Sequence, residues 1–185
     1  MSSTDGREIG SDLVSTMHWA LHTEAKFGRH AREVWPVFRD IRSWYTEYTF
    51  DVISGPPYQA GVGLVEDQVM KVTSSKGLPR TSGSTAAGAP EFFIHKTIKV
   101  DPPMEIVVLL SGSAYDFKQY TSFYVWKVME SDNDTTILVN TYGEAELIER
   151  LPTREFLAYR EEIASNWRRS WSEAFVSLKK ALQIG

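Results

Sequence analysis

The first patterned stretch of the chain alternates apolar and polar positions. One face of residues 17–27 carries Met17, Trp19, Leu21, Thr23, Ala25 and Phe27. The positions between them are mostly polar: His18, Ala20, His22, Glu24 and Lys26. A period of two is typical of a β-strand with one buried face, so we expect a half-buried strand here. Residues 1–15 lack such a pattern and are expected to form a flexible tail.

A short helix is expected after this strand, over residues 31–42. Gly28 interrupts the alternation, and Val34, Trp35, Phe38 and Ile41 then recur at helical spacing. The connector that follows leads into a second strand at residues 49–54, and it is crowded with aromatic side chains: Trp44, Tyr45, Tyr48 and Phe50.

The middle of the chain predicts a series of strands separated by turns. Strand-length runs are found at residues 62–72, 91–100, 105–111, 118–130 and 135–146. Turn-forming residues separate them, such as Asp101-Pro102-Pro103 and the segment from Gly112 to Asp116. Residues 73–90 are rich in Gly, Ser, Thr, Ala and Pro without periodicity, so we expect a long flexible loop there.

The chain closes with a long amphipathic helix, expected over residues 153–183. Thr153 supplies an oxygen suited to capping its first turn. Large apolar residues recur along it, at intervals of three and four after the first step: Phe156, Ile163, Trp167, Trp171, Phe175, Leu178 and Leu182. Such a stripe indicates a helix laid on an apolar surface. Antiparallel strands with one face over this helix would bury the whole set, which predicts an α+β fold.

Composition narrows the class of protein. The chain has 185 residues, 42% hydrophobic and 24% charged, which suits one globular domain over residues 16–185. A net charge of −4 without a basic stripe argues against nucleic-acid binding. The absence of cysteine excludes disulfides, thiolate nucleophiles and Cys-ligated metals. No apolar run has the length of a membrane span and no secretory signal is evident, so the cytoplasm is the expected compartment.

Three segments resemble motifs of a known superfamily. Arg32-Glu33-Val34-Trp35 and Ile41-Arg42-Ser43-Trp44 resemble its helix entry, and Ile98 to Val107 resembles its strand, Asp-Pro-Pro, strand corner. The terminal helix from Trp171 to Leu182 also fits. The superfamily is SRPBCC, the START-like or helix-grip group, which includes bacterial polyketide aromatase/cyclases, the birch-pollen-allergen family and several lipid carriers.

The resemblance spans residues 17–182 and implies a helix-grip fold. That fold wraps a curved antiparallel sheet of about six to seven strands around a long C-terminal helix, with short helices after the first strand. The chain is most similar to the polyketide cyclase/dehydrase-type members, which points to bacterial secondary metabolism. The matching motifs are structural, so they bear on fold more than on activity. Residues 73–90 depart from the group's pattern.

A pocket is expected between the concave side of the sheet and the helix. Residues 136–142 resemble the strand whose alternate residues line the pocket of the cyclases, which sets the expected inward faces of the last two strands: Tyr120, Ser122, Tyr124 and Trp126 opposite Leu138, Asn140 and Tyr142. The candidate ligand-binding residues are Trp44, Tyr48, Tyr120, Tyr124, Trp126, Asn140, Tyr142, Ile163 and Trp167. Rings with a few polar groups suit an aromatic or polyketide-like ligand. The alternative is a filled core whose tyrosine hydroxyls reach water.

The candidate catalytic residues are His95, Asp67 and Tyr142. Simple alternation leaves His95 in water, but a β-bulge would turn it inward. There its imidazole could act as an acid or base near neutral pH. Asp67 and Glu66 point to opposite faces of their expected strand, so at most one of them lies inside.

No metal or cofactor is expected. His18 and His22 lie on a strand, where four residues span about 13 Å, too far for one ion. The sequence has no Gly-rich phosphate loop, nucleophile elbow or dinucleotide fingerprint. Any catalysis is therefore expected to be cofactor-free and to rest on positioning and proton transfer.

Three functions remain open from the sequence. The protein could carry or sequester a small apolar or aromatic molecule. It could instead be an enzyme that directs cyclisation, aromatisation or dehydration of a polyketide-type substrate. A protein-partner module is the third alternative and would require an exposed apolar patch. Both a monomer and a homodimer are compatible with the sequence.

Overall fold

The computed structural model describes four stretches of the chain, residues 19–74, 92–115, 118–143 and 153–184. The elements follow in this order: β1 (Trp19–Phe27), α2 (Ala31–Arg39), α3 (Ile41–Trp44), β2 (Tyr48–Ser54), β3 (Val69–Ser74), β4 (Phe93–Asp101), β5 (Glu105–Tyr115), β6 (Lys118–Ser131), β7 (Asp134–Gly143) and α4 (Thr153–Ile184). The expected tail at 1–15 and most of the expected loop at 73–90 lie outside the described residues.

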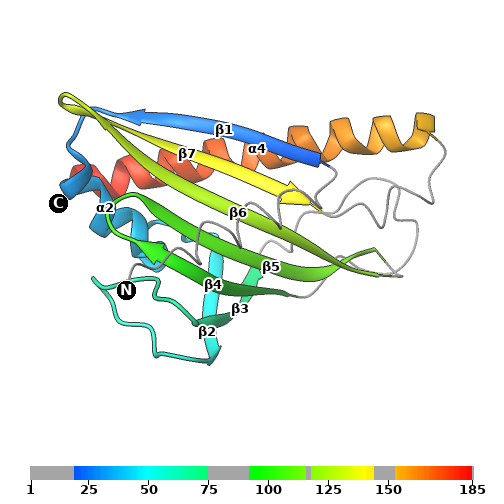
Figure 1. The fold of residues 1–185 in the computed structure, drawn as a ribbon, viewed down its shortest axis with the longest axis horizontal. Coiled ribbons are helices and arrows are strands. Elements are labelled where there is room, and N and C mark those ends of the chain that lie inside the picture. Colours follow the sequence, from blue (N-terminus) through cyan, green and yellow to red (C-terminus); the bar gives the residue numbers. More distant parts are fainter. Residues whose placement is uncertain (1–18, 75–91, 116–117, 144–152, 185) are drawn as a thin grey trace, which may run out of the picture.

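The strands form one sheet in the order β1-β7-β6-β5-β4-β3-β2, and every neighbouring pair is antiparallel. The first strand therefore pairs with the last. Figure 1 shows α4 running along one face of the sheet, with α2 close to the C-terminal end of α4. A long helix against an antiparallel sheet, with short helices after the first strand, confirms the predicted α+β architecture.

The core lies between the helices and one face of the sheet, here called the inner face, which carries Ile106, Val108, Ile137 and Val139. The apolar stripe of α4 packs against it, because the described members of the stripe are all buried: Trp167, Trp171, Phe175, Leu178 and Leu182. Removing each large apolar side chain from water contributes about 1.5–3 kcal/mol. This packing positions α4 over the rings described below.

The N-terminus of α2 is held by Glu130, which lies near the end of β6. His30, at the N-cap position, makes no side-chain capping hydrogen bond. Instead the Ala31 N–H donates to Oε1 of Glu130 on β6 over 3.1 Å, and His30 Nδ1 lies 3.1 Å from the same oxygen. These two contacts lower the pKa of Glu130. The first N–H groups of a helix have no partner within it, so Glu130 replaces the missing cap.

The expected strand at residues 62–72 was wrong in its first half, because β3 begins only at Val69. Gly61, Gly63 and Asp67 have positive φ angles, which end an extended run. At Gly63 the chain also meets the end of α2, and the Leu64 N–H donates to the Arg39 carbonyl over 3.0 Å. Residues 62–68 are thus a loop docked on α2.

Two other boundaries differ from the prediction. The expected helix at residues 31–42 is divided at Asp40, whose backbone leaves the helical region with a ψ of 68°. The expected turn from Gly112 to Asp116 is mostly strand, because β5 continues to Tyr115. Neither change alters the order of the elements.

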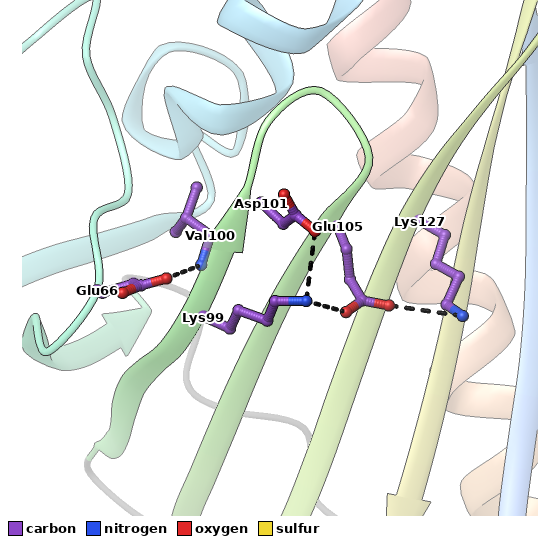
Figure 2. Close-up of polar contacts among 6 residues, drawn as sticks. All are labelled: Glu66, Lys99, Val100, Asp101, Glu105 and Lys127. Atoms are coloured by element: carbon purple, nitrogen blue, oxygen red, sulfur yellow. Dashed lines mark hydrogen bonds and ion pairs between the residues drawn. The ribbon is translucent and has the colours of Figure 1, made fainter. Parts of the chain in front are cut away.

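Charged residues cross three strands on the outer face of the sheet (Figure 2). Lys99 Nζ on β4 lies 3.4 Å from Asp101 and 3.2 Å from Glu105, and Glu105 lies 3.5 Å from Lys127 on β6. Burial opposes the charge on Lys99, but the two carboxylates outweigh it and raise the pKa of its ammonium. Glu66 accepts a hydrogen bond from the Val100 N–H over 3.0 Å. Together these contacts hold β4 where its register changes.

Candidate functional site

A β-bulge in β4 turns His95 toward the core. The pairing with β5 runs through Thr97↔Val108 and then skips one residue to Lys99↔Val107, which leaves Ile98 as the extra residue. The skip lets Val100 pack on the core while Thr97 and His95 also point inward, both almost fully buried. The structure therefore adopts the bulged alternative at this strand.

On β7 the residues that face the core are not those that were predicted, whereas Tyr124 and Trp126 on β6 face it as predicted. On β6, Trp126 is buried and Tyr124 packs on the core as predicted, but on β7 the buried residues are Thr135, Ile137, Val139 and Thr141. Asn140 is on the outer face, where His22 Nδ1 lies 2.9 Å from its side-chain oxygen. Its assignment to the pocket was wrong, because one residue of register exchanges the faces of a strand.

Aromatic rings from six elements and the α3–β2 connector meet over the inner face. We call this set the inner aromatic cluster: Phe38, Trp44, Tyr45, Tyr48, Phe50, His95, Tyr124, Trp126, Trp167, Trp171 and Phe175. Trp126 lies near its middle, with ring centroids 5.6 Å from Phe38, 5.6 Å from Trp171 and 6.2 Å from His95. Most of these contacts are tilted or edge-to-face, the geometries that aromatic quadrupoles favour.

The buried titratable groups of the cluster are held neutral. Burial lowers the pKa of His95 to about 3, and it raises the pKa of Tyr124 to about 12. Burial, with the nearby Tyr48, also raises the pKa of Tyr45 well above its usual value of 10.0. These three side chains therefore carry no charge at physiological pH, so the cluster presents rings and neutral polar atoms.

Several buried polar atoms of the described residues have no hydrogen-bond partner: Gln68 Oε1, His95 Nε2, Thr97 Oγ1, Trp126 Nε1, Thr141 Oγ1 and Trp167 Nε1. Thr141 and Trp167 face the Tyr124 hydroxyl and lower its pKa against the effect of burial. Buried polar groups are nearly always paired, so such a group calls for an explanation. The rings of His95 and Trp126 are in contact near the middle of the cluster, and each carries one of these unpartnered atoms. They are therefore the central residues of the candidate site.

The other candidate residues are distributed as follows. Trp44 is buried in the cluster, and its indole N–H donates to the Phe38 carbonyl over 2.9 Å. Tyr48 and Trp167 also belong to the cluster. Asp67 is exposed in the loop before β3, so the structure does not support it as a catalytic candidate. The side chains of Tyr120, Tyr142, Ile163 and Ser122 lie outside the described residues.

Sequence reasoning missed two buried polar residues, Gln68 and Thr97, which are joined by a backbone hydrogen bond beyond His95 along β4. Gln68 is fully buried and its Nε2 donates to the Pro56 carbonyl over 3.1 Å, while Thr97 is buried one inward position along β4. Gln68 was expected within a continuous strand, and the loop that buries it depends on the tertiary contact of Gly63 with α2. The bulge in β4 has no clear signature in the sequence.

The part of the chain that the structure describes contains no group of three or more His, Asp or Glu residues placed to hold a metal ion. None of its helices is long and apolar enough to cross a membrane. A hollow of about 420 Å³ opens on the surface beside β2, lined by Arg42, Val52, Ile53, Ser54, Gly55, Pro57 and Tyr58. None of the candidate ligand-binding residues lines this hollow.

No protein-family model and no curated protein matches the sequence. Solved structures match the fold. Ara h 8.0201 has a TM-score of 0.60 at 12% identity, with 90% of this chain and 99% of that chain covered. DynU16, from the dynemicin biosynthetic locus, has 0.53 at 12%, covering 89% of this chain and 47% of its own. CalU16 from Micromonospora echinospora has 0.51 at 12%, covering 89% and 81%. These are SRPBCC-type folds, and this chain has the same helix-grip fold.

Proposed function

We propose that the protein binds a small aromatic or otherwise hydrophobic molecule against the inner aromatic cluster and acts as a carrier or sequestering protein. The observation that carries the proposal is the pair of unpartnered polar atoms, His95 Nε2 and Trp126 Nε1, among the rings. A buried polar group without a partner costs about 1–3 kcal/mol, so a core evolved only for stability would avoid the pair. Polar atoms of a ligand could supply the missing partners.

The protonation states favour binding over catalysis. A general acid or base works best when its pKa is near the operating pH. The pKa of His95, about 3, and that of Tyr124, about 12, are both far from neutrality. A cyclase or dehydratase that used His95 or Tyr124 would need that side chain to exchange a proton, whereas a carrier needs only their hydrogen bonds. The fold shared with DynU16 of a biosynthetic locus supports a ligand from natural-product metabolism.

The test is a titration of the purified protein with the three-ring hydrocarbon fluorene and with 1-naphthol, followed by tryptophan fluorescence and by the melting temperature. Enclosing about 300 Å² of apolar ligand surface is worth about 7 kcal/mol at ~25 cal/mol per Å². That free energy corresponds to a Kd on the order of 10 µM before immobilisation costs are subtracted. Saturable quenching together with a raised melting temperature is the expected result.

Two variants place the binding on the inner face. Tyr124→Leu changes a ring beside Trp126 and is expected to weaken binding severalfold, whereas Asn140→Ala changes the outer face and is expected to leave it unchanged. The proposal is wrong if neither compound binds saturably to the wild-type protein, or if Asn140→Ala weakens binding as much as Tyr124→Leu does.

A further inference from the structure

At the middle of the inner aromatic cluster, one unpartnered atom is an obligate hydrogen-bond donor and the other can donate. The Nε1–H of a tryptophan can only donate, and Trp126 Nε1 is buried without an acceptor. A neutral imidazole carries one N–H, and His95 donates from Nε2 in its Nε2–H tautomer. The two rings are in edge contact, with centroids 6.2 Å apart and planes at 76°. With His95 in that tautomer, Trp126 Nε1 and His95 Nε2 both lack an acceptor.

The surroundings select an uncharged acceptor. Among the residues that the structure describes, the rings in contact with Trp126 and His95 belong to Phe38, Phe50, Tyr124 and Trp171, and none of them carries a charge. Burial also keeps His95 neutral, since its pKa falls to about 3. Transferring a carboxylate or phosphate into such surroundings without a cationic partner is strongly unfavourable. A carbonyl oxygen accepts hydrogen bonds, has two lone pairs and carries no net charge.

The surroundings also select a flat molecule. Rings from β2, β6, α2 and α4 each contact Trp126 or His95 directly, with centroid separations between 5.6 and 6.5 Å. Planar rings gain from offset and edge-to-face contacts with such neighbours. A flat ring system can bring an oxygen to the donors while its faces contact the cluster.

We infer that the site recognises a planar aromatic ketone or quinone, whose carbonyl oxygen accepts hydrogen bonds from Trp126 Nε1–H and His95 Nε2–H. This inference rests on the proposed function and specifies its ligand class. These two hydrogen bonds distinguish the carbonyl-bearing ligand from a hydrocarbon with the same ring skeleton. Removing either donor should therefore reduce the preference for the carbonyl without reducing the affinity for the hydrocarbon.

A pair of compounds isolates the carbonyl. Fluorenone and fluorene share a flat three-ring skeleton, and a C=O group in the first replaces a CH₂ group in the second. Two hydrogen bonds to a carbonyl that would otherwise be unmatched predict that wild-type protein binds fluorenone about tenfold more tightly than fluorene. Trp126→Phe and His95→Phe each keep a ring and remove a donor. Each is expected to reduce the ratio of the two Kd values about threefold or more.

The control is Trp35→Phe, because Trp35 is buried in α2 outside the inner aromatic cluster. This variant is expected to keep the wild-type ratio. Thermal melting first establishes that each variant is folded, and His95→Phe carries the test if Trp126→Phe fails to fold. Equal affinities for fluorenone and fluorene in the wild-type protein would overturn the inference and leave the proposed function standing. A ratio that survives in both donor variants would also overturn it. Failure of fluorenone, fluorene and 1-naphthol alike to bind would overturn the proposed function itself.

Discussion

The imidazole of His95 on β4 lies edge-on to the indole of Trp126 on β6, although β5 separates their strands. The contact depends on the bulge at Ile98, because without it the imidazole would point to the outer face. It also depends on burial, since both rings are almost inaccessible to water. The burial that packs His95 against the Trp126 indole also makes the protonated imidazole unfavourable in the folded state.

The first prediction concerns stability at acidic pH. His95 has a pKa of about 3 in the folded protein against an ordinary value of 6.5, and burial is the cause. Above pH 6.5 neither state protonates it, so its contribution to stability is constant. As the pH falls from 6.5 toward 3, the unfolded chain binds one more proton than the folded one. The free energy of unfolding should then fall by about 1.4 kcal/mol per pH unit from this group.

Urea denaturation at pH 7, 6, 5 and 4 measures this slope, and a variant isolates the contribution of His95. His95→Phe should show a shallower loss of stability between pH 6.5 and 4 than wild type, whatever its stability at pH 7. His22→Gln changes an exposed imidazole and should keep the wild-type slope. Parallel curves for wild type and His95→Phe would show that His95 is not buried as the structure has it.

The second prediction tests the register of β7 with two isomeric side chains. Ile137 is fully buried on the inner face, whereas the adjacent Leu138 is only half-buried on the outer face. Ile137→Ala should lower the free energy of unfolding by about 2–5 kcal/mol, because it leaves a cavity in the core. Leu138→Ala should cost less than about 1 kcal/mol. Chemical denaturation compares the two, and the reverse order would restore the register that the sequence suggested.

The overall fold was predictable because it rests on long-range patterns. The alternation over residues 17–27 placed Leu21 and Phe27 inside, and the stripe of α4 placed Trp167 and Trp171 against the sheet, as the structure confirms. Each of these elements repeats its signal several times. An error at one position does not change such a pattern.

The candidate site was predictable only in part, because a shift of one residue in a strand decides which side chains face the core. Trp126 and Tyr124 were expected on the correct face, but the bulge at Ile98 and the register of β7 each depend on one residue. The observed register of β7 differs by one position from the predicted one, so Asn140 lies on the outer face instead of the inner face. The positive φ angle of Asp67 likewise turned an expected strand residue into an exposed loop residue.

The third prediction compares two glycines of the loop that docks on α2. Gly61 and Gly63 both have positive φ angles, but a Cβ at Gly61 would meet nothing within 4 Å. A Cβ at Gly63 would lie 2.2 Å from the carbonyl oxygen of Arg39. Gly61→Ala should therefore cost about 1–2 kcal/mol for the backbone conformation alone. Gly63→Ala should cost a further ~1–3 kcal/mol, because the clash is with backbone. Equal melting temperatures of the two variants would contradict the close approach of this loop to α2.

The last prediction tests whether α4 completes the core. Trp171 is 4% exposed, and its ring contacts Tyr45, Tyr124, Trp126, Trp167 and Phe175. Truncating a buried tryptophan typically costs about 3–5 kcal/mol. For a domain of this size, that cost corresponds to a fall in melting temperature of about 6–20 °C.

The matched control lies on the opposite side of the same helix, where Val176 is 50% exposed. Val176→Ala removes little buried surface and replaces a β-branched residue with a better helix former, so its stability should stay within about 0.5 kcal/mol of wild type. Differential scanning calorimetry of the two variants gives the comparison directly. A small shift for Trp171→Ala would mean that the sheet and its rings are stable without α4. The rings that it covers could then not form an enclosed ligand site, because one side would be open to water.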